Sequence, residues 1–171
     1  LPAGKNFHAQ VSKPEGEVKW DIDRQTGALR SYMYNGKEML ASPVVLSLYR
    51  PVTDNDNRER TGGARAWKKA GLDNLVQKAT FVESSAKGGK AKVELLNAEG
   101  RKVGTADFLY TLRKNGTLEV KTTFVPDTAV ITSLARVGLA FEMPDTYNQV
   151  SYLGRGEHET YADRNRSGRI G

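Results

Sequence analysis

The amino-acid sequence predicts an all-β fold, an antiparallel β-sandwich, on three observations. Apolar and polar side chains alternate with a period of two in four stretches, as in strands that have one face on a core and one face in water. Turn sequences containing glycine separate such stretches, so strands recur roughly every 8–12 residues, the spacing of a sandwich or barrel. No long helical pattern alternates with the strands, which argues against a parallel α/β fold.

The alternating stretches predict the first strands. In residues 18–23, Val18, Trp20 and Ile22 share one face, and we expect Trp20 to pack in the core because its neighbours on that face are apolar. The same alternation occurs at Ala106, Phe108, Tyr110 and Leu112, at Leu118, Val120, Thr122 and Phe124, and at Ala135, Val137, Leu139, Phe141 and Met143.

Short turn signals predict how these strands connect. The dipeptides at 35–36 and 115–116 are Asn-Gly, and glycine takes the positive φ that a tight hairpin requires. Gly-Gly at 88–89 and Glu-Gly at 99–100 enclose the run 90–96 and predict two further reversals. Only residues 66–72 favour a helix, which would be one or two turns long with Gly71 near its end.

Length and composition predict one globular β-sandwich domain over residues 1–171. The chain has 171 residues, of which 38% are hydrophobic and 27% charged. No stretch approaches the roughly 18 apolar residues of a membrane span, so no membrane partner is expected. Residues 1–8 lack a signal-peptide pattern and resemble the middle of a longer protein. Cysteine is absent, which excludes disulfides and thiolate sites and fits either cytoplasm or periplasm.

The positive charge does not predict a nucleic-acid partner. The formal net charge is +6, and basic residues cluster at 58–69 and 163–169. Neither cluster has the interleaved aromatic residues of a single-strand platform or a helix suited to reading a groove. We interpret the clusters as a solvated basic surface or as a face that meets an acidic neighbouring domain.

Catalytic and metal motifs are weak in this sequence. Asp54, Asp56, Glu157 and Glu159 are carboxylates, but nothing around them predicts the facing acid and nucleophile that cleave a glycosidic bond. Residues 54–57 begin like a calcium loop, yet arginine and glutamate at the next two positions break that motif. We therefore expect no catalytic residue and assign no metal ligand. A cation bound by Asp54 and Asp56 stays an open alternative.

A dense polar segment at 153–164 is the strongest candidate for binding. It contains His158, and two closely spaced glycines at 154 and 156 predict a tight turn that presents polar side chains. The other histidine, His8, lies in a predicted loose N-terminal arm. Trp67 lies in the polar segment that leads into the short helix, where it could cover a loop or stack on a sugar ring.

Three blocks of sequence, in order along the chain, support a resemblance to a known family. The first is V-K-W-D-I-D-R-Q-T-G-A-L-R at 18–30 with G-K-E-M-L at 36–40, the second Y-R-P-V-T-D-N-D at 49–56 with R-A-W-K-K-A-G-L at 65–72, and the third V-G-L-A-F-E-M-P at 137–144 with Y-L-G-R-G-E-H-E-T-Y-A-D-R at 152–164. Together they resemble the front half of the C-terminal, small-chain-type domain of the glycoside hydrolase family 2 β-galactosidases. Departures are Glu157, Thr160 and Ala162, where the family usually has proline, asparagine and proline.

The resemblance implies a fold and a role. The domain would be part of a galactose-mutarotase-like supersandwich within a larger multidomain glycosidase, non-catalytic, packed on a separate (β/α)8 barrel that holds the catalytic glutamates. Through the parent active site it would meet the galactoside substrate. Residues implied at the substrate rim or the domain interface are Arg50, Asp54, Asn55, Asp56, Trp67, Arg155, His158, Glu159, Tyr161, Asp163 and Arg164.

The resemblance also implies cofactors, partners and motion. Parent enzymes often use Mg and Na bound mainly by other domains, so no cofactor is expected here. Since the family's sandwich continues beyond Gly171, we expect uncovered strands and self-association of this chain. Residues 57–64 have no large apolar anchor and are expected to form a mobile loop at the pocket rim.

Two other functions stay open. One is an autonomous carbohydrate-binding β-sandwich module. The other is a mutarotase-type sugar epimerase, since the fold permits it but does not imply it. The acid and base of an epimerase must converge, whereas His158 and Glu159 are adjacent and would point to opposite faces of a strand.

Overall fold

The computed structural model describes residues 16–58, 63–151, 154–156, 166 and 168–170. The strands are β1 Val18–Ile22, β2 Leu29–Tyr34, β3 Lys37–Glu38, β4 Val45–Ser47, β5 Val76–Ser85, β6 Gly88–Leu96, β7 Lys102–Leu112, β8 Leu118–Pro126 and β9 Gly138–Ala140, and the helices are α1 Asp54–Arg58 and α2 Gly63–Ala70. All of the paired strands are antiparallel, which confirms the predicted all-β sandwich. In the described part of the chain, no helix is long and apolar enough to cross a membrane.

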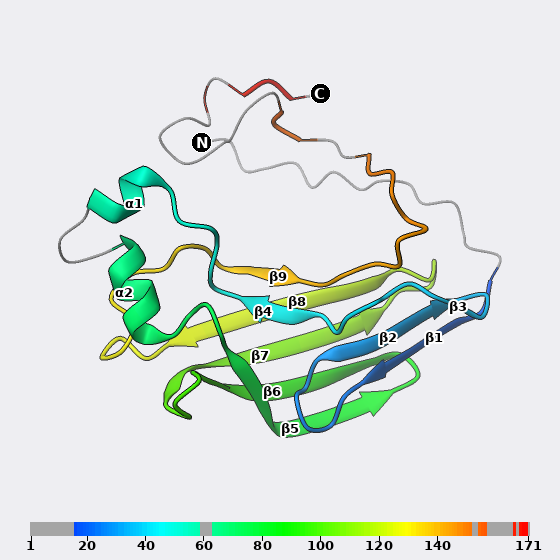
Figure 1. The fold of residues 1–171 in the computed structure, drawn as a ribbon. Coiled ribbons are helices and arrows are strands. Elements are labelled where there is room, and N and C mark those ends of the chain that lie inside the picture. Colours follow the sequence, from blue (N-terminus) through cyan, green and yellow to red (C-terminus); the bar gives the residue numbers. More distant parts are fainter. Residues whose placement is uncertain (1–15, 59–62, 152–153, 157–165, 167, 171) are drawn as a thin grey trace.

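The strands form two layers (Figure 1). One layer is a four-stranded meander in the order β5-β6-β7-β8. The other consists of the sheet β1-β2-β3 and the two-stranded ladder β4-β9, which lie over the same face of the meander. Buried residues between the layers are Ala91, Val93, Leu95, Ala106, Phe108 and Tyr110 from the meander, and Ile22, Leu29, Leu46 and Leu48 from the opposite side.

Two polar side chains bind the layers together inside the core. The Tyr110 hydroxyl donates a hydrogen bond to the Gly27 carbonyl at 2.9 Å. The Gln77 side chain accepts one from the Leu46 N–H at 2.6 Å and donates one to the Thr26 carbonyl at 3.3 Å. Trp20 is partly buried and packs against the core residue Tyr110, with ring centroids 6.2 Å apart, on the face that the alternation predicts.

The predicted turns are largely confirmed. Asn35 and Gly36 have φ of 51° and 75° in the β2–β3 hairpin, and Gly116 has φ of 82° between β7 and β8. The Gly-Gly pair at 88–89 begins β6 directly after the predicted reversal, which is the turn at 86–87 between β5 and β6. A Cβ on Gly89 would come within 2.8 Å of Ile22 Cδ1, so this glycine permits close packing of the layers rather than a turn.

The predicted helix is confirmed, and the last predicted strand is mostly wrong. Helix α2 covers residues 63–70 and ends at Gly71, whose φ is 72°. In residues 135–143, only Gly138–Ala140 (β9) is a strand, paired with the three residues of β4. Phe141 and Met143 are therefore exposed, at 53% and 45%, instead of sharing a buried face.

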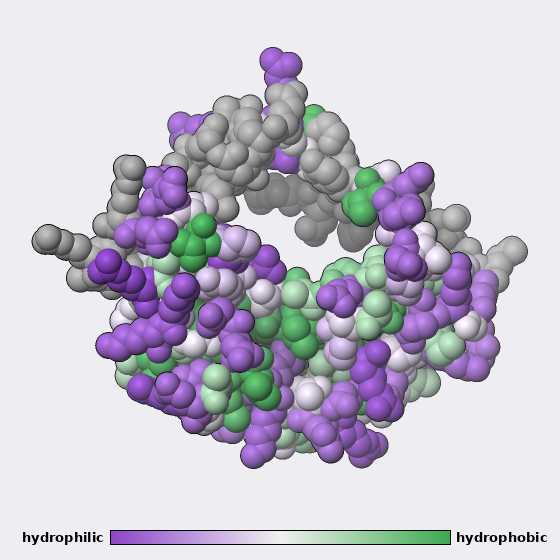
Figure 2. Space-filling view, viewed as in Figure 1, coloured by the Kyte–Doolittle hydropathy of each residue, from purple (hydrophilic) through white to green (hydrophobic). Residues whose placement is uncertain are grey.

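Apolar side chains are not confined to the interior. In Figure 2, hydrophilic residues cover most of the surface, but apolar residues gather near the centre of this face, over β4, β8 and β9.

Candidate functional site

The Asp56 carboxylate is held by two bonds from one guanidinium group. Arg50 Nη1 donates to Asp56 Oδ2 at 2.7 Å, and Arg50 Nη2 donates to Asp56 Oδ1 at 2.9 Å. Arg50 Nη1 also donates to the Pro51 carbonyl at 3.0 Å. The two charged side chains are only 18% and 13% exposed. A bidentate pair at this burial fixes geometry more firmly than a surface ion pair.

The Asp56 carboxylate also caps the N-terminus of helix α1. Asp56 Oδ2 accepts hydrogen bonds from the Thr53 N–H at 2.7 Å and from the Thr53 hydroxyl at 2.8 Å, and the Asp56 N–H donates to the Thr53 carbonyl at 3.1 Å. This arrangement satisfies backbone groups at the start of a helix, as a capping box does. A five-residue helix has little stability of its own, so α1 depends on these contacts.

Trp67 connects this pair to the core. The Arg50 guanidinium lies over the Trp67 ring, 5.2 Å from its centroid, and Tyr49 meets the ring edge-on at 6.5 Å. Trp67 is 4% exposed, and its Nε1–H donates to the Ser133 hydroxyl at 3.2 Å. We call Arg50, Asp56 and Trp67, together with Thr53, the Arg50 cluster.

Gly63, the first residue of α2, brings the two helices together. Its φ is 60°, and a Cβ there would lie 2.4 Å from the Asp56 carbonyl oxygen. The backbones of α1 and α2 therefore approach closely at a point that only glycine permits. The Arg50 cluster thus fixes both helices against the core.

The electrostatics of the Arg50 cluster favour an ionised Asp56. Hydrogen bonds from the Arg50 guanidinium hold the pKa of Asp56 at about 2, below its ordinary value of 3.8, and the Thr53 donors act in the same direction against the effect of burial. A carboxyl whose pKa is depressed on folding adds stability above its ordinary pKa and loses it as the pH falls through the folded-state pKa.

Asp56→Asn is therefore expected to make the chain less stable near neutral pH, by about 1–2 kcal/mol in the free energy of unfolding. This difference from the native chain should shrink between about pH 4 and pH 2, where Asp56 becomes protonated. Urea unfolding at several pH values measures it. Asp107→Asn, at an exposed position on β7, is the control. A difference that stays constant down to about pH 2 would contradict the assigned pKa.

The predicted site residues fall into four groups. Arg50, Asp56 and Trp67 meet in the Arg50 cluster, whereas Asp54 and Asn55 lie exposed on α1. Arg155 forms a short antiparallel bridge with Ile170, beside the Gly156 N–H that donates to the Arg169 carbonyl at 3.0 Å. The predicted residues that lie outside the described part of the chain are His158, Glu159, Tyr161, Asp163 and Arg164. A rim or interface role for the set stays a prediction.

The predicted mobile loop at 57–64 needs correction at both ends. Asn57 and Arg58 are the last residues of α1, and Gly63 and Ala64 are buried residues at the start of α2. The contacts of Asp56 with Thr53 and Arg50 hold the first end in α1, and Gly63 begins α2 where the two backbones approach closely. Residues 59–62 lie outside the described residues.

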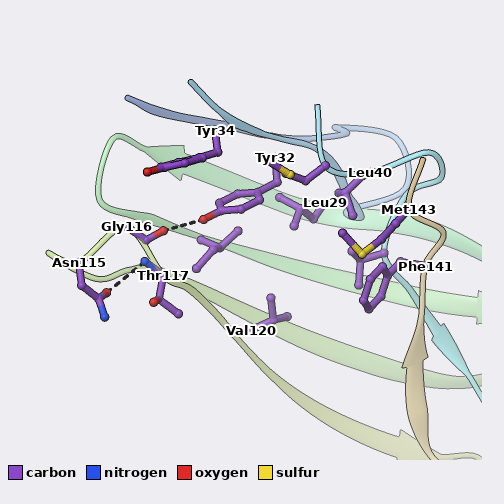
Figure 3. A pocket seen from close by; sticks show the side chains of 13 residues that line it. Leu29, Tyr32, Tyr34, Leu40, Asn115, Gly116, Thr117, Val120, Phe141 and Met143 are labelled. Carbon is purple, nitrogen blue, oxygen red and sulfur yellow. Dashed lines mark hydrogen bonds between the residues drawn. The ribbon is translucent and has the colours of Figure 1, made fainter. Parts of the chain in front are cut away.

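A second feature, which we call the apolar hollow, was missed by sequence reasoning. It has a volume of about 510 Å³ and lies between β2, the β7–β8 turn, β8 and the segment after β9 (Figure 3). Its walls include Tyr32, Tyr34, Val120, Phe141 and Met143. The available signal was the placement of Tyr32 and Tyr34 on one face of a strand.

One wall of the apolar hollow is fixed by a long-range hydrogen bond. The Tyr32 hydroxyl donates to the Gly116 carbonyl at 2.6 Å, and burial raises the pKa of Tyr32. Asn115 Oδ1 accepts the Thr117 N–H at 3.1 Å, which fixes the turn itself. No aspartate or glutamate is among the described residues that line the hollow. Such a surface suits apolar side chains or the apolar face of a sugar ring.

Comparison with known proteins gives a consistent result. A family model described as "Beta galactosidase small chain" matches residues 14–171. The chain is 29% identical over 181 residues to a β-galactosidase of Vibrio cholerae, covering 100% of this chain and 18% of the relative. It is 26% identical over 168 residues to a β-galactosidase of Actinobacillus pleuropneumoniae, covering 96% of this chain and 16% of the relative. The chain thus spans about one sixth of the relatives it matches.

Proposed function

Since this chain belongs to the β-galactosidase small-chain family, we propose that it is a non-catalytic β-sandwich part of a larger β-galactosidase. The proposal rests on the match of residues 14–171 to this family. The β-galactosidase relatives described above are about six times longer than this chain. The parent polypeptide would hydrolyse terminal β-galactosides with carboxylates that lie elsewhere in its sequence.

We further propose that the region of the Arg50 cluster borders the active site of the parent enzyme and packs on its catalytic barrel. Trp67 is buried and lies beneath the Arg50 guanidinium, so in this role it is a positioning residue. Asp54 and Asn55, exposed on α1, are the side chains of this region best placed to meet another domain or a sugar.

The purified chain is expected to release no chromophore from a chromogenic β-galactoside above the buffer control. The described lining of the apolar hollow contains no carboxylate, and Asp56 is held by Arg50. A continuous absorbance assay measures this, with a complete β-galactosidase as the positive control. Turnover that disappears on replacing Glu157 or Glu159 would overturn the non-catalytic role.

The apolar hollow favours a second candidate, an autonomous carbohydrate-binding module. Tyr32 and Tyr34 offer ring faces, and Asn115 lines the same end of the hollow with its amide turned toward Thr117. Titration with galactose and lactose, followed by NMR, separates the two functions. Saturable shifts at these residues would support binding by the chain alone, and unchanged spectra would leave only the accessory role.

Self-association is expected because the apolar hollow is open to solvent. Phe141 and Met143 are 53% and 45% exposed on its wall, and exposed apolar patches mark association surfaces. Light scattering should detect a dimer or larger species, and the double variant Phe141→Ser, Met143→Ser should be largely monomeric. Val76→Ser is the control, since Val76 is 54% exposed on β5, outside the hollow. A native chain that stays monomeric at high concentration would contradict this expectation.

A further inference from the structure

A second hollow, which we call the basic hollow, lies between helix α2, the turn that joins β6 to β7, and the segment after β8. Its volume is about 410 Å³. Three cationic side chains line it, from Arg65 and Lys69 on α2 and Arg101 in the turn, together with Thr132. No carboxylate is among the described residues that line it.

Within the described part of the chain, none of the three cations has an ion-pair partner. The ion pairs in the described residues are formed by other cations, and none of them involves Arg65, Lys69 or Arg101. The positive charges around one hollow therefore repel one another without internal compensation. An anion bound between them would remove that repulsion.

The turn that carries Arg101 is held in place before any ligand binds. Asn97 is buried, its Oδ1 accepts the Arg101 N–H at 2.9 Å, and its own N–H donates to the Arg101 carbonyl at 2.9 Å. Gly71, which ends α2, packs directly on Asn97, since a Cβ on Gly71 would lie 2.7 Å from Asn97 Cβ. The end of α2 is thus fixed against the turn.

The third wall is held in the same way. The hydrogen bond from Trp67 to Ser133 joins α2 to the segment after β8. In that segment, the Asp127 N–H donates to the Val103 carbonyl at 2.9 Å, and the Val130 N–H donates to the Asp127 carbonyl at 3.0 Å. Figure 1 places α2 and this segment at the same end of the meander. The basic hollow is consequently preformed, which lowers the entropy cost of binding.

We propose that the basic hollow is a binding site for a compact multivalent oxyanion, phosphoryl or polycarboxylate. Guanidinium groups recognise such oxygens in bidentate fashion, and Lys69 adds a point charge. The size falls in the range of small-molecule sites, and the apolar residues Ala66 and Val130 line the hollow beside its charges. The site does not depend on the proposed β-galactosidase role.

The test is a titration of the isotope-labelled chain with inorganic phosphate and, separately, with citrate, followed by NMR against sodium chloride of equal ionic strength. We expect saturable amide shifts at residues 65–69, 99–101 and 129–132. The variants Lys69→Gln and Arg101→Gln each remove one positive charge. Each should weaken binding roughly tenfold, as loss of one charge-assisted contact does. Saturation by phosphate alone or citrate alone identifies which source of oxyanion the site takes.

Lys68→Gln is the matched control, because Lys68 is an exposed neighbour on the same helix and does not line the hollow. It should change the affinity less than about twofold, in proportion to its long-range charge. Shifts that grow without saturation, shifts that sodium chloride reproduces, or an equal loss in Lys68→Gln would each overturn the proposal. All three substitutions are at exposed positions, so dispersed spectra of the variants verify that folding is intact.

Discussion

Replacing Trp67 with alanine is expected to lower the free energy of unfolding by about 3–5 kcal/mol, the range for a large buried aromatic side chain. The indole is 4% exposed, and the change would also remove the surface on which Arg50 lies and the donor to Ser133. Urea unfolding followed by circular dichroism measures the loss.

Trp67→Phe separates packing from the polar contact. It keeps much of the ring volume but lacks the Nε1–H, so a loss of about 1–2 kcal/mol is expected. If Trp67→Ala cost no more than Trp67→Phe, the indole would not be an anchor of the core.

Gly63→Ala is expected to cost about 3 kcal/mol or more in the free energy of unfolding, because two penalties add. Alanine is strained at a φ of 60°, and its Cβ would lie 2.4 Å from the Asp56 carbonyl oxygen, which belongs to the backbone and cannot rotate away. The helices α1 and α2 would have to separate, so the bonds between Arg50 and Asp56 should weaken as well.

Gly100→Ala measures the backbone penalty alone, so the difference from Gly63→Ala gives the cost of the close contact. Gly100 has a φ of 76° but nothing within 4 Å of an added Cβ, so only the cost of the backbone conformation, about 1 kcal/mol, is expected. Chemical denaturation of the two variants gives the comparison. Equal losses would show that the close approach of α1 to α2 carries no energetic weight.

Three strands of the meander, β6 to β8, were predictable from the sequence, because short turns join them and alternation reports which face is buried. Strand β5 was not predicted, since its burial does not alternate regularly. Ala106, Phe108 and Tyr110 all lie on the inner face as predicted. For the Arg50 cluster, the sequence predicted Arg50, Asp56 and Trp67 as site residues but not the contacts between them. Helix α1 was missed because it exists through contacts of Asp56 with Thr53 and Arg50, which no local pattern reports.

The apolar hollow was not predictable for a related reason. Its walls meet through contacts distant in sequence, such as the bond from Tyr32 to Gly116. The alternation at 135–143 predicts a half-buried strand, but a period of two states only that one face is apolar. Alternation does not show whether another strand covers that face. None of the described strands covers Phe141 and Met143.

The connection between the layers has a consequence for the order of folding. Each ladder of the meander links strands that follow one another in sequence, so its contacts close short loops. The β4–β9 ladder instead joins Val45 to Ala140, across the entire meander. During synthesis, β1 to β4 leave the ribosome before the surface that buries them exists. We therefore expect the meander to be the nucleus of folding and the β4–β9 ladder to close last, which amide exchange during refolding would reveal as late protection at residues 45–47.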